Sequence, residues 1–320
     1  MLAVLTGCVL LAGCQEVSGD SPPNSGRPPT LFGGKGDMYV DPAGPAARWV
    51  AAHPESPDRD TIAKSIASRP AARLVTAPRA QLRGDLVSYL DGATAANEQP
   101  FLLADADSAV RCSPSPHDDR QTRLSTYREW FTELGTLIGT RSALVVVKAG
   151  RSARPGCGAR IGETERIEIA KASVEQLHRS PHVLVFLDVT DLAGTSPPAA
   201  ATFATSVGLG NLTGLALDVG GYQPETSAKE IRMILNRTAP HNRIFILTDS
   251  SRNGAQTDTT CNPPGAQLGT GESVGDDPAN TQQLWLTTPG ISDGPCGLAP
   301  DSTRGEFVPR LALALIPREK

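Results

Sequence analysis

Acidic residues stand at the ends of short apolar segments along this 320-residue chain. They are Asp105, Asp107, Asp188, Asp218, Asp249 and Asp293, and Lys148 ends one further segment. If the segments are parallel strands of a barrel, their carboxyl ends meet at one face and the carboxylates form a ring suited to a polyol or a sugar. Each residue alone also fits a structural role, because Asp commonly caps helices and begins turns after strands.

The segments that would position this ring are continuous runs of Val, Ile and Leu, as in strands buried on both faces. Strands are predicted at Arg73–Thr76, Phe101–Ala104, Ala143–Lys148, Val183–Val189, Gly214–Val219, Arg243–Thr248 and Leu284–Thr287. Helices are predicted at Ala80–Leu90, Thr122–Ile138, Glu163–His178, Ala199–Val207, Ser227–Thr238 and Gly305–Leu315. This alternation predicts a single α/β domain over residues 38–320, built as a parallel β/α barrel. An open doubly wound sheet is the alternative.

Composition argues against two classes of partner. The net charge is −4, so the chain has no basic field with which to hold nucleic acid or an anionic membrane surface. Aromatic residues make up only 4% of the chain, which is a small supply for a site that stacks many flat rings in a row.

The amino-terminal residues indicate export. Residues 1–14 contain a short apolar run that ends in Leu-Ala-Gly before Cys14, the arrangement of a signal segment with a cysteine placed for lipidation. Cys8 fits the same pattern loosely, and an ordinary cleaved signal is the alternative. Residues 15–37 are rich in Pro, Gly and Ser and suit a flexible tether. We therefore expect an exported, lipid-anchored protein whose only membrane contact is this anchor.

The remaining cysteines are Cys112, Cys157, Cys261 and Cys296. An even number in an exported chain favours disulfides over metal ligands, and pairing neighbours in the sequence would give two bridges. No C-x-x-C spacing occurs among them, and the five histidines form no H-E-x-x-H motif. We expect no metal and no cofactor.

Four motifs resemble glycoside hydrolase family 6, the endoglucanases and cellobiohydrolases that cut β-1,4-glucan. They are Met38–Trp49, Thr248–Gly254, the C-N-P-P-G sequence Cys261–Gly265, and Leu284–Cys296 with the family spacing of W-V-K-x-P-G-E-S-D-G-x-C. The resemblance implies a distorted β/α barrel with a cleft or tunnel across the strand ends and a saccharide ligand. It also implies the disulfide pairs Cys112–Cys157 and Cys261–Cys296.

The same resemblance indicates that catalytic groups are missing. The family's general acid is an Asp seven residues before a disulfide Cys, and that position is Gly150. In the family, a second Asp keeps the pKa of the acid high, and Arg111 stands at its position in this chain. A cation there would lower the pKa of a nearby carboxylic acid. For this reason Gly150→Asp alone, beside Arg111 and Lys148, is expected to stay inactive. The family's sugar-contacting Lys and Glu become Thr287 and Ile291, and its Trp platforms become Leu74, Gly194 and Thr260.

Several family residues remain. Asp293 is the candidate base, and the expected substrate-binding residues are Asp188, Asp249, Arg252, Asn253 and Trp285. Asp188 and Arg252 fit a structural role equally well. Asp105 or Asp107 lies near the lost acid and is the candidate to replace it.

Three functions follow from these residues. The first is a weak or inactive glucanase relative that binds a saccharide. The second is an active inverting glycoside hydrolase on a short or non-cellulosic β-glucan, with Asp293 and one of the two replacement acids. The third is a structural lipoprotein of the cell envelope.

We predict that Cys112–Cys157 and Cys261–Cys296 are both bridged in the exported protein. Mass spectrometry of unreduced peptides is expected to find these two cross-linked pairs. Free thiols or crossed pairs would contradict the prediction.

Overall fold

The computed structural model describes residues 38–110, 119–151, 161–223, 226–269, 273–274 and 281–317. Seven parallel strands form one sheet in the order β1-β2-β3-β4-β5-β6-β8. Their bounds are β1 Arg73–Val75, β2 Phe101–Asp105, β3 Ala143–Lys148, β4 Val183–Asp188, β5 Gly214–Leu217, β6 Phe245–Asp249 and β8 Thr281–Leu284. The short β7, Ser273–Val274, pairs antiparallel with β8 at the edge.

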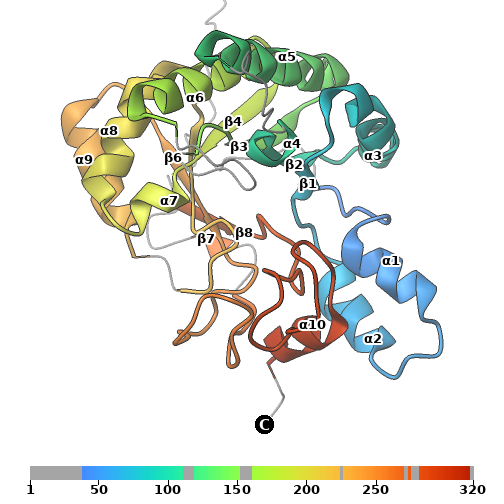
Figure 1. Cartoon of the computed structure of the whole chain (residues 1–320). Coiled ribbons are helices and arrows are strands. Elements are labelled where there is room, and N and C mark those ends of the chain that lie inside the picture. The colour runs from blue at the N-terminus through green and yellow to red at the C-terminus, as the bar shows by residue number, and fades with distance from the viewer. Residues whose placement is uncertain are drawn as a thin grey trace, which may run out of the picture.

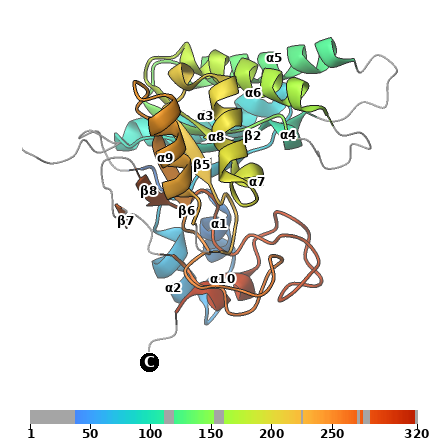
Figure 2. The same ribbon diagram turned by 90° about the vertical axis from the view of Figure 1, so that its left-hand side faces the viewer.

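Helices cover the outer face of this sheet in an arc that Figure 1 shows. The longer ones are α3 Leu82–Ala96, α5 Arg120–Ile138, α6 Glu163–His178, α8 Pro197–Val207 and α9 Ala228–Thr238. The short α4 Ala106–Ala109 and α7 Thr190–Ala193 follow β2 and β4 directly. A separate group, α1 Pro45–Ala52, α2 Arg59–Ile62, the π-helical turn Ala63–Ala67 and α10 Pro309–Leu315, lies away from the arc (Figure 2).

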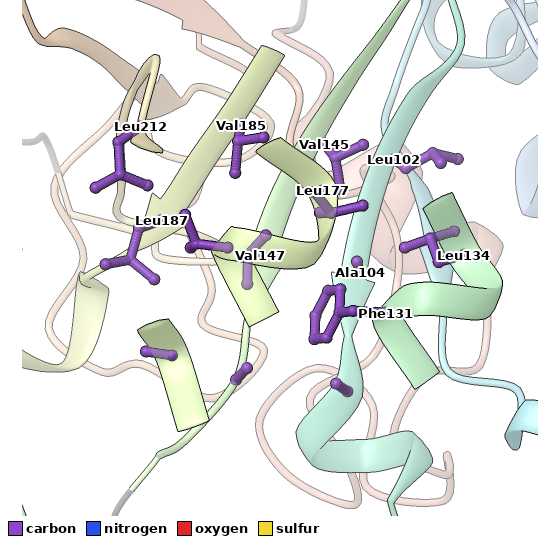
Figure 3. Close-up of a cluster of buried hydrophobic side chains, with 14 of the residues drawn as sticks. Leu102, Ala104, Phe131, Leu134, Val145, Val147, Leu177, Val185, Leu187 and Leu212 are labelled. Carbon is purple, nitrogen blue, oxygen red and sulfur yellow. The ribbon is translucent and has the colours of Figure 1, made fainter. Parts of the chain in front are cut away.

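Alternation along each strand separates two hydrophobic clusters. Leu102, Val145, Val185 and Leu187 point outward and pack against helix residues such as Phe131 (Figure 3). The strand residues between them belong to an inner cluster without helix residues: Phe101, Leu103, Leu144, Val146, Phe186, Ala216, Leu247 and Leu284. A doubly wound sheet would carry helices on both faces, so the predicted β/α barrel is confirmed and the alternative is wrong.

The barrel is incomplete between its first and last strands. In the described residues, β1 and β8 do not pair with each other. The backbone N–H of Ala72 donates to the carbonyl oxygen of Trp285 at 2.9 Å across this gap. The sheet is therefore a curled half-barrel that opens beside β1.

Most predicted elements lie within two residues of their observed bounds, although α3 continues six residues beyond its predicted end at Leu90. Two further differences have physical causes. The last strand spans Thr281–Leu284, whereas the prediction is Leu284–Thr287. The apolar pattern continues to Leu286 because this residue still belongs to the inner cluster, although strand pairing has ended before it. The final helix begins only at Pro309, since proline fits the first helical turn.

Close packing of neighbouring strands requires Gly214. A Cβ built on this residue would lie 2.2 Å from the carbonyl oxygen of Phe245 and 2.4 Å from the ring of Phe186. No residue with a side chain fits between β4 and β6 at this point.

We predict that Gly214→Ala lowers the free energy of unfolding by about 1–3 kcal/mol or more, because the new methyl group overpacks the sheet. The matched control is Gly84→Ala, on the exposed side of α3 with no atom within 4 Å of the new Cβ. This control should raise stability by roughly 0.4–1 kcal/mol. Denaturant unfolding measures both variants, and an unchanged midpoint for Gly214→Ala would contradict the packing argument.

Candidate functional site

The predicted acidic residues do gather at the carboxyl ends of the strands. Asp105, Asp188 and Asp249 are the last residues of β2, β4 and β6, and Lys148 is the last residue of β3. Asp218 follows β5 directly. All therefore lie at one face of the half-barrel, where a β/α barrel carries its functional groups.

Asp105 acts as the amino-terminal cap of α4. One carboxylate oxygen accepts a hydrogen bond from the backbone N–H of Ser108 at 3.0 Å, and the other accepts one from the Ser108 hydroxyl at 2.9 Å. The residue is 7% exposed. Both oxygens of this candidate acid are thus engaged within the protein.

Asp107 is held more tightly still. It accepts hydrogen bonds from the Tyr127 hydroxyl at 2.6 Å and from the backbone N–H groups of Gly150 at 2.8 Å and Arg151 at 3.1 Å. Its side chain is 0% exposed. Burial raises the pKa of the Asp107 carboxyl, and the hydrogen bonds act against that rise. This carboxyl joins α4 and α5 to the loop after β3.

Gly150 occupies the position where the resemblance places the general acid. Its φ is +76°, in the left-handed region, and a Cβ would lie 2.8 Å from the carbonyl oxygen of Arg166 and 3.3 Å from Cγ2 of Ile169. The backbone here turns toward α6 and leaves no space for a side chain. A side chain at this position would therefore meet both an unfavourable backbone conformation and filled space.

Asp188 and Lys148 face one another across β4 and β3. The Lys148 Nζ lies 3.8 Å from Oδ2 of Asp188, whose Oδ1 accepts a hydrogen bond from the backbone N–H of Thr190 at 3.0 Å. The side chain of Asp188 is 6% exposed and that of Lys148 is 16% exposed. Asp188 thus starts the turn into α7 while its second oxygen faces a cation.

Asp249 is fully buried and joins three strand ends. It accepts hydrogen bonds from the backbone N–H groups of Gly220 at 2.8 Å, Ser251 at 2.9 Å and Leu286 at 3.1 Å, and from the Thr287 hydroxyl at 3.0 Å. Burial raises the pKa of its carboxyl against these hydrogen bonds. Its contacts are those of a structural centre between β5, β6 and β8.

Asp293, the candidate base, forms an ion pair with Arg252. Nη2 of Arg252 lies 2.8 Å from Oδ1, and Nη1 lies 3.4 Å from Oδ2. The Tyr222 hydroxyl donates to Oδ2 at 2.7 Å, and the Asn262 backbone N–H does so at 3.2 Å. Burial raises the pKa of the Tyr222 phenol, so the group remains a donor. Four donors therefore converge on this carboxylate, and both of its oxygens are engaged within the protein.

Tyr222 and Asn262 are the residues that the sequence reasoning missed. Asn262 has φ +43°; its side-chain amide donates to the carbonyl of Gly294 at 2.8 Å, and its side-chain oxygen accepts the N–H of Asp293 at 3.0 Å. It therefore connects the C-N-P-P-G loop to the loop of Asp293. The motif itself was the available signal for Asn262. For Tyr222 the only available signal was its place after a predicted strand.

The other two expected substrate-binding residues differ in accessibility. Asn253 is partly exposed, and its amide nitrogen lies 3.5 Å from Oδ2 of Asp218. Trp285 is only 2% exposed and packs with residues of α1, α2 and α10. The guanidinium carbon of Arg69 lies 4.3 Å from the centroid of its ring. In this conformation the Trp285 ring is covered and offers no face for a sugar to stack on.

A pocket of about 290 Å³ lies in the gap between β1 and the segment after β8, and we call it the gap pocket. Thr287 and Ile291, at the positions of the family's sugar-contacting Lys and Glu, line it. Leu74, at a position where the resemblance expects Trp, also lines the pocket and is 47% exposed. The pocket is therefore open at the places where the expected sugar contacts have been replaced.

The disulfide Cys261–Cys296 is present, which confirms that pair. It joins the Asn262 loop to the Asp293 loop and so fixes the surroundings of the Arg252–Asp293 ion pair. Cys14, Arg111, Cys112 and Cys157 lie outside the described residues.

We predict that Gly150→Asp lowers the free energy of unfolding and yields no hydrolase activity. The left-handed backbone costs a non-Gly residue about 1–2 kcal/mol, and the contact with the Arg166 carbonyl adds an overpacking cost of about 1–3 kcal/mol. Gly210→Ala, at an exposed position with open space around the new Cβ, is the control that should be at least as stable as the wild type. A wild-type unfolding midpoint for Gly150→Asp, or glucan hydrolysis by it, would contradict this prediction.

Comparison with known proteins agrees with the motifs. The sequence matches the family described as glycosyl hydrolases family 6 over residues 35–310. Endoglucanase 1 of Streptomyces halstedii is 28% identical over 303 residues, which cover 92% of both chains. Endoglucanase A of Thermobispora bispora is 28% identical over 87% of this chain, which spans 61% of that protein's length.

A solved structure of an endoglucanase shares the fold of this chain. A Mycobacterium tuberculosis endoglucanase, solved in complex with a methyl cellobiosyl thio-cellobioside, superposes with a TM-score of 0.70. The identity is 23%, and the superposition covers 88% of this chain and 96% of the other. The chain therefore belongs to glycosyl hydrolases family 6.

Proposed function

We propose that this protein is a saccharide-binding member of the family that hydrolyses its ligand slowly or not at all. The observation that carries the proposal is Gly150, which stands where the resemblance places the acid and has a positive φ and no free space for a side chain. Inverting hydrolysis needs an acid for the leaving oxygen and a carboxylate to assist water on the opposite face of the sugar. Loss of the acid alone removes roughly 10²–10⁴-fold in rate.

Replacement of the acid by Asp107 is disfavoured by its surroundings. A raised pKa suits a general acid, but the side chain is 0% exposed and already accepts hydrogen bonds from Tyr127, Gly150 and Arg151. A glycosidic oxygen must come within hydrogen-bonding distance of the proton that it receives. That approach would require the loop after β3 to leave Asp107.

Asp105 meets a similar objection. Its two oxygens cap α4 through Ser108, so proton donation would compete with the cap. The active-hydrolase alternative therefore depends on rearrangement of buried contacts, whereas binding at the gap pocket needs none.

Saccharide binding is supported by family membership and by the gap pocket. The Mycobacterium tuberculosis relative is described in complex with a cellobiose-type ligand. In this chain the pocket lies in the gap beside β1 and is lined by Thr287 and Ile291. Because Leu74 replaces a Trp, we expect weaker binding of neutral cello-oligosaccharides than an aromatic platform would give.

Export and anchoring at Cys14 complete the proposal. They rest on the apolar run and the cysteine within residues 1–14, followed by the tether of residues 15–37. No helix in the described part of the chain is long and apolar enough to cross a membrane. The structural-lipoprotein alternative predicts no saccharide binding at all, so a binding measurement separates it from our proposal.

We predict that the purified full-length protein releases no reducing sugar from soluble β-glucans or short cello-oligosaccharides above the level of its Asp293→Asn variant. The isosteric amide is preferable to alanine, because removal of the partner of Arg252 risks unfolding the site. Thermal unfolding of both proteins checks that the comparison is between folded forms.

Hydrolysis at an ordinary enzyme rate, abolished by Asp105→Asn or Asp107→Asn in a folded variant, would overturn the proposal. It would establish the rearranged-carboxylate hydrolase in its place. Calorimetric titration with cellotetraose tests the binding half of the proposal separately from catalysis.

A further inference from the structure

The gap pocket carries more positive than negative charge. Its lining includes Arg48, Arg69 and Arg73 but only two acidic residues, Asp41 and Asp85. The formal charge of the lining is thus +1, in a chain whose net charge is −4. The local charge is opposite in sign to that of the whole protein.

Both carboxylates of the pocket form ion pairs with the same arginine, Arg73. Nη1 of Arg73 lies 2.7 Å from Oδ2 of Asp41, and Nη2 lies 3.0 Å from Oδ1 of Asp85. Arg48 is exposed and donates to the carbonyl oxygen of Ala43. The pocket's acidic groups therefore leave Arg69 without a counter-charge.

Arg69 is held in place without being neutralised. Among the described residues, its guanidinium forms no ion pair and no hydrogen bond, and it lies over the ring of the buried Trp285 at 4.3 Å. Stacking on an aromatic face orients a guanidinium while leaving its N–H donors at the edge. The result is an oriented set of donors with a full positive charge at the wall of a pocket.

The other walls offer little to a neutral sugar. Leu74 is an aliphatic side chain where a flat platform would help most, and Arg69 covers the ring of Trp285. The Thr288 hydroxyl, which lines the pocket, has no hydrogen-bond partner in the described structure and is available to a ligand hydroxyl. Charge is therefore the strongest means of recognition that this pocket has.

We propose that the gap pocket selects a saccharide that carries a carboxylate, a uronic acid unit, and that the Arg69 guanidinium binds this carboxylate. The planar donor set of arginine matches a carboxylate in two-point geometry, and such charge-assisted hydrogen bonds are stronger than neutral ones. This inference rests on the proposed saccharide-binding function and names its ligand class.

The test compares two disaccharides of the same size, cellobiose and cellobiouronic acid, by calorimetric titration of the full-length protein at low ionic strength. Wild type should bind cellobiouronic acid about tenfold or more tightly than cellobiose. This preference should shrink at about 0.5 M salt, because the anion is then screened.

Arg69→Gln should remove the preference, and Arg69→Lys should keep part of it. The matched control is Arg179→Gln, the same loss of charge at an exposed residue that follows α6 and does not line the gap pocket. It should keep the full preference. Thermal unfolding of each variant identifies any that fails to fold. If Arg69→Gln does not fold, the binding preference of Arg69→Lys is compared with that of the wild type instead.

Two results would overturn the inference. Equal binding of the two disaccharides by the wild type would leave the proposed function standing and remove the charge selection. A preference that survives in folded Arg69→Gln would place the anion elsewhere. If neither these disaccharides nor cellotetraose binds, both the inference and the proposed function fail.

Discussion

The carboxyl ends of parallel strands expose backbone N–H groups in the loops that follow, and the structure depends on satisfying them. Aspartate side chains do this at each of the strand ends considered. Asp107 accepts from the loop after β3, Asp188 from the turn into α7, and Asp249 from loops that follow three strands. The ring of carboxylates that suggests catalysis in the sequence is therefore largely a ring of backbone acceptors.

A second set of contacts stabilises the loops around Asp293. The Arg252–Asp293 ion pair, Asn262 and the disulfide Cys261–Cys296 all hold the same two loops together. Each of them stabilises the barrel whether or not a sugar is cut. Gly150, at the position where the resemblance places the general acid, takes part in this packing as well, because its backbone N–H donates to Asp107.

In the proposed function, the side chains of the gap pocket decide which saccharide it can recognise. A Trp would offer an uncharged sugar ring a large apolar face, whereas Leu74 offers a small one. The Arg69 guanidinium covers the ring of Trp285, so a charged group stands where an exposed ring would offer stacking. The recognition proposed here depends on ionic strength and on a charge of the ligand, which neutral glucan chains lack.

The sequence by itself determined the class of fold, the positions of β3 and α6 to the residue, and the family. It could do so because buried strands and amphipathic helices have local periodicities, and because motifs such as C-N-P-P-G are contiguous. Only the tertiary structure decided that Trp285 is covered by Arg69, that Tyr222 bonds Asp293, and that Gly150 has no space for a side chain. These facts depend on atoms from segments distant in the sequence, and no local pattern records how closely such segments approach.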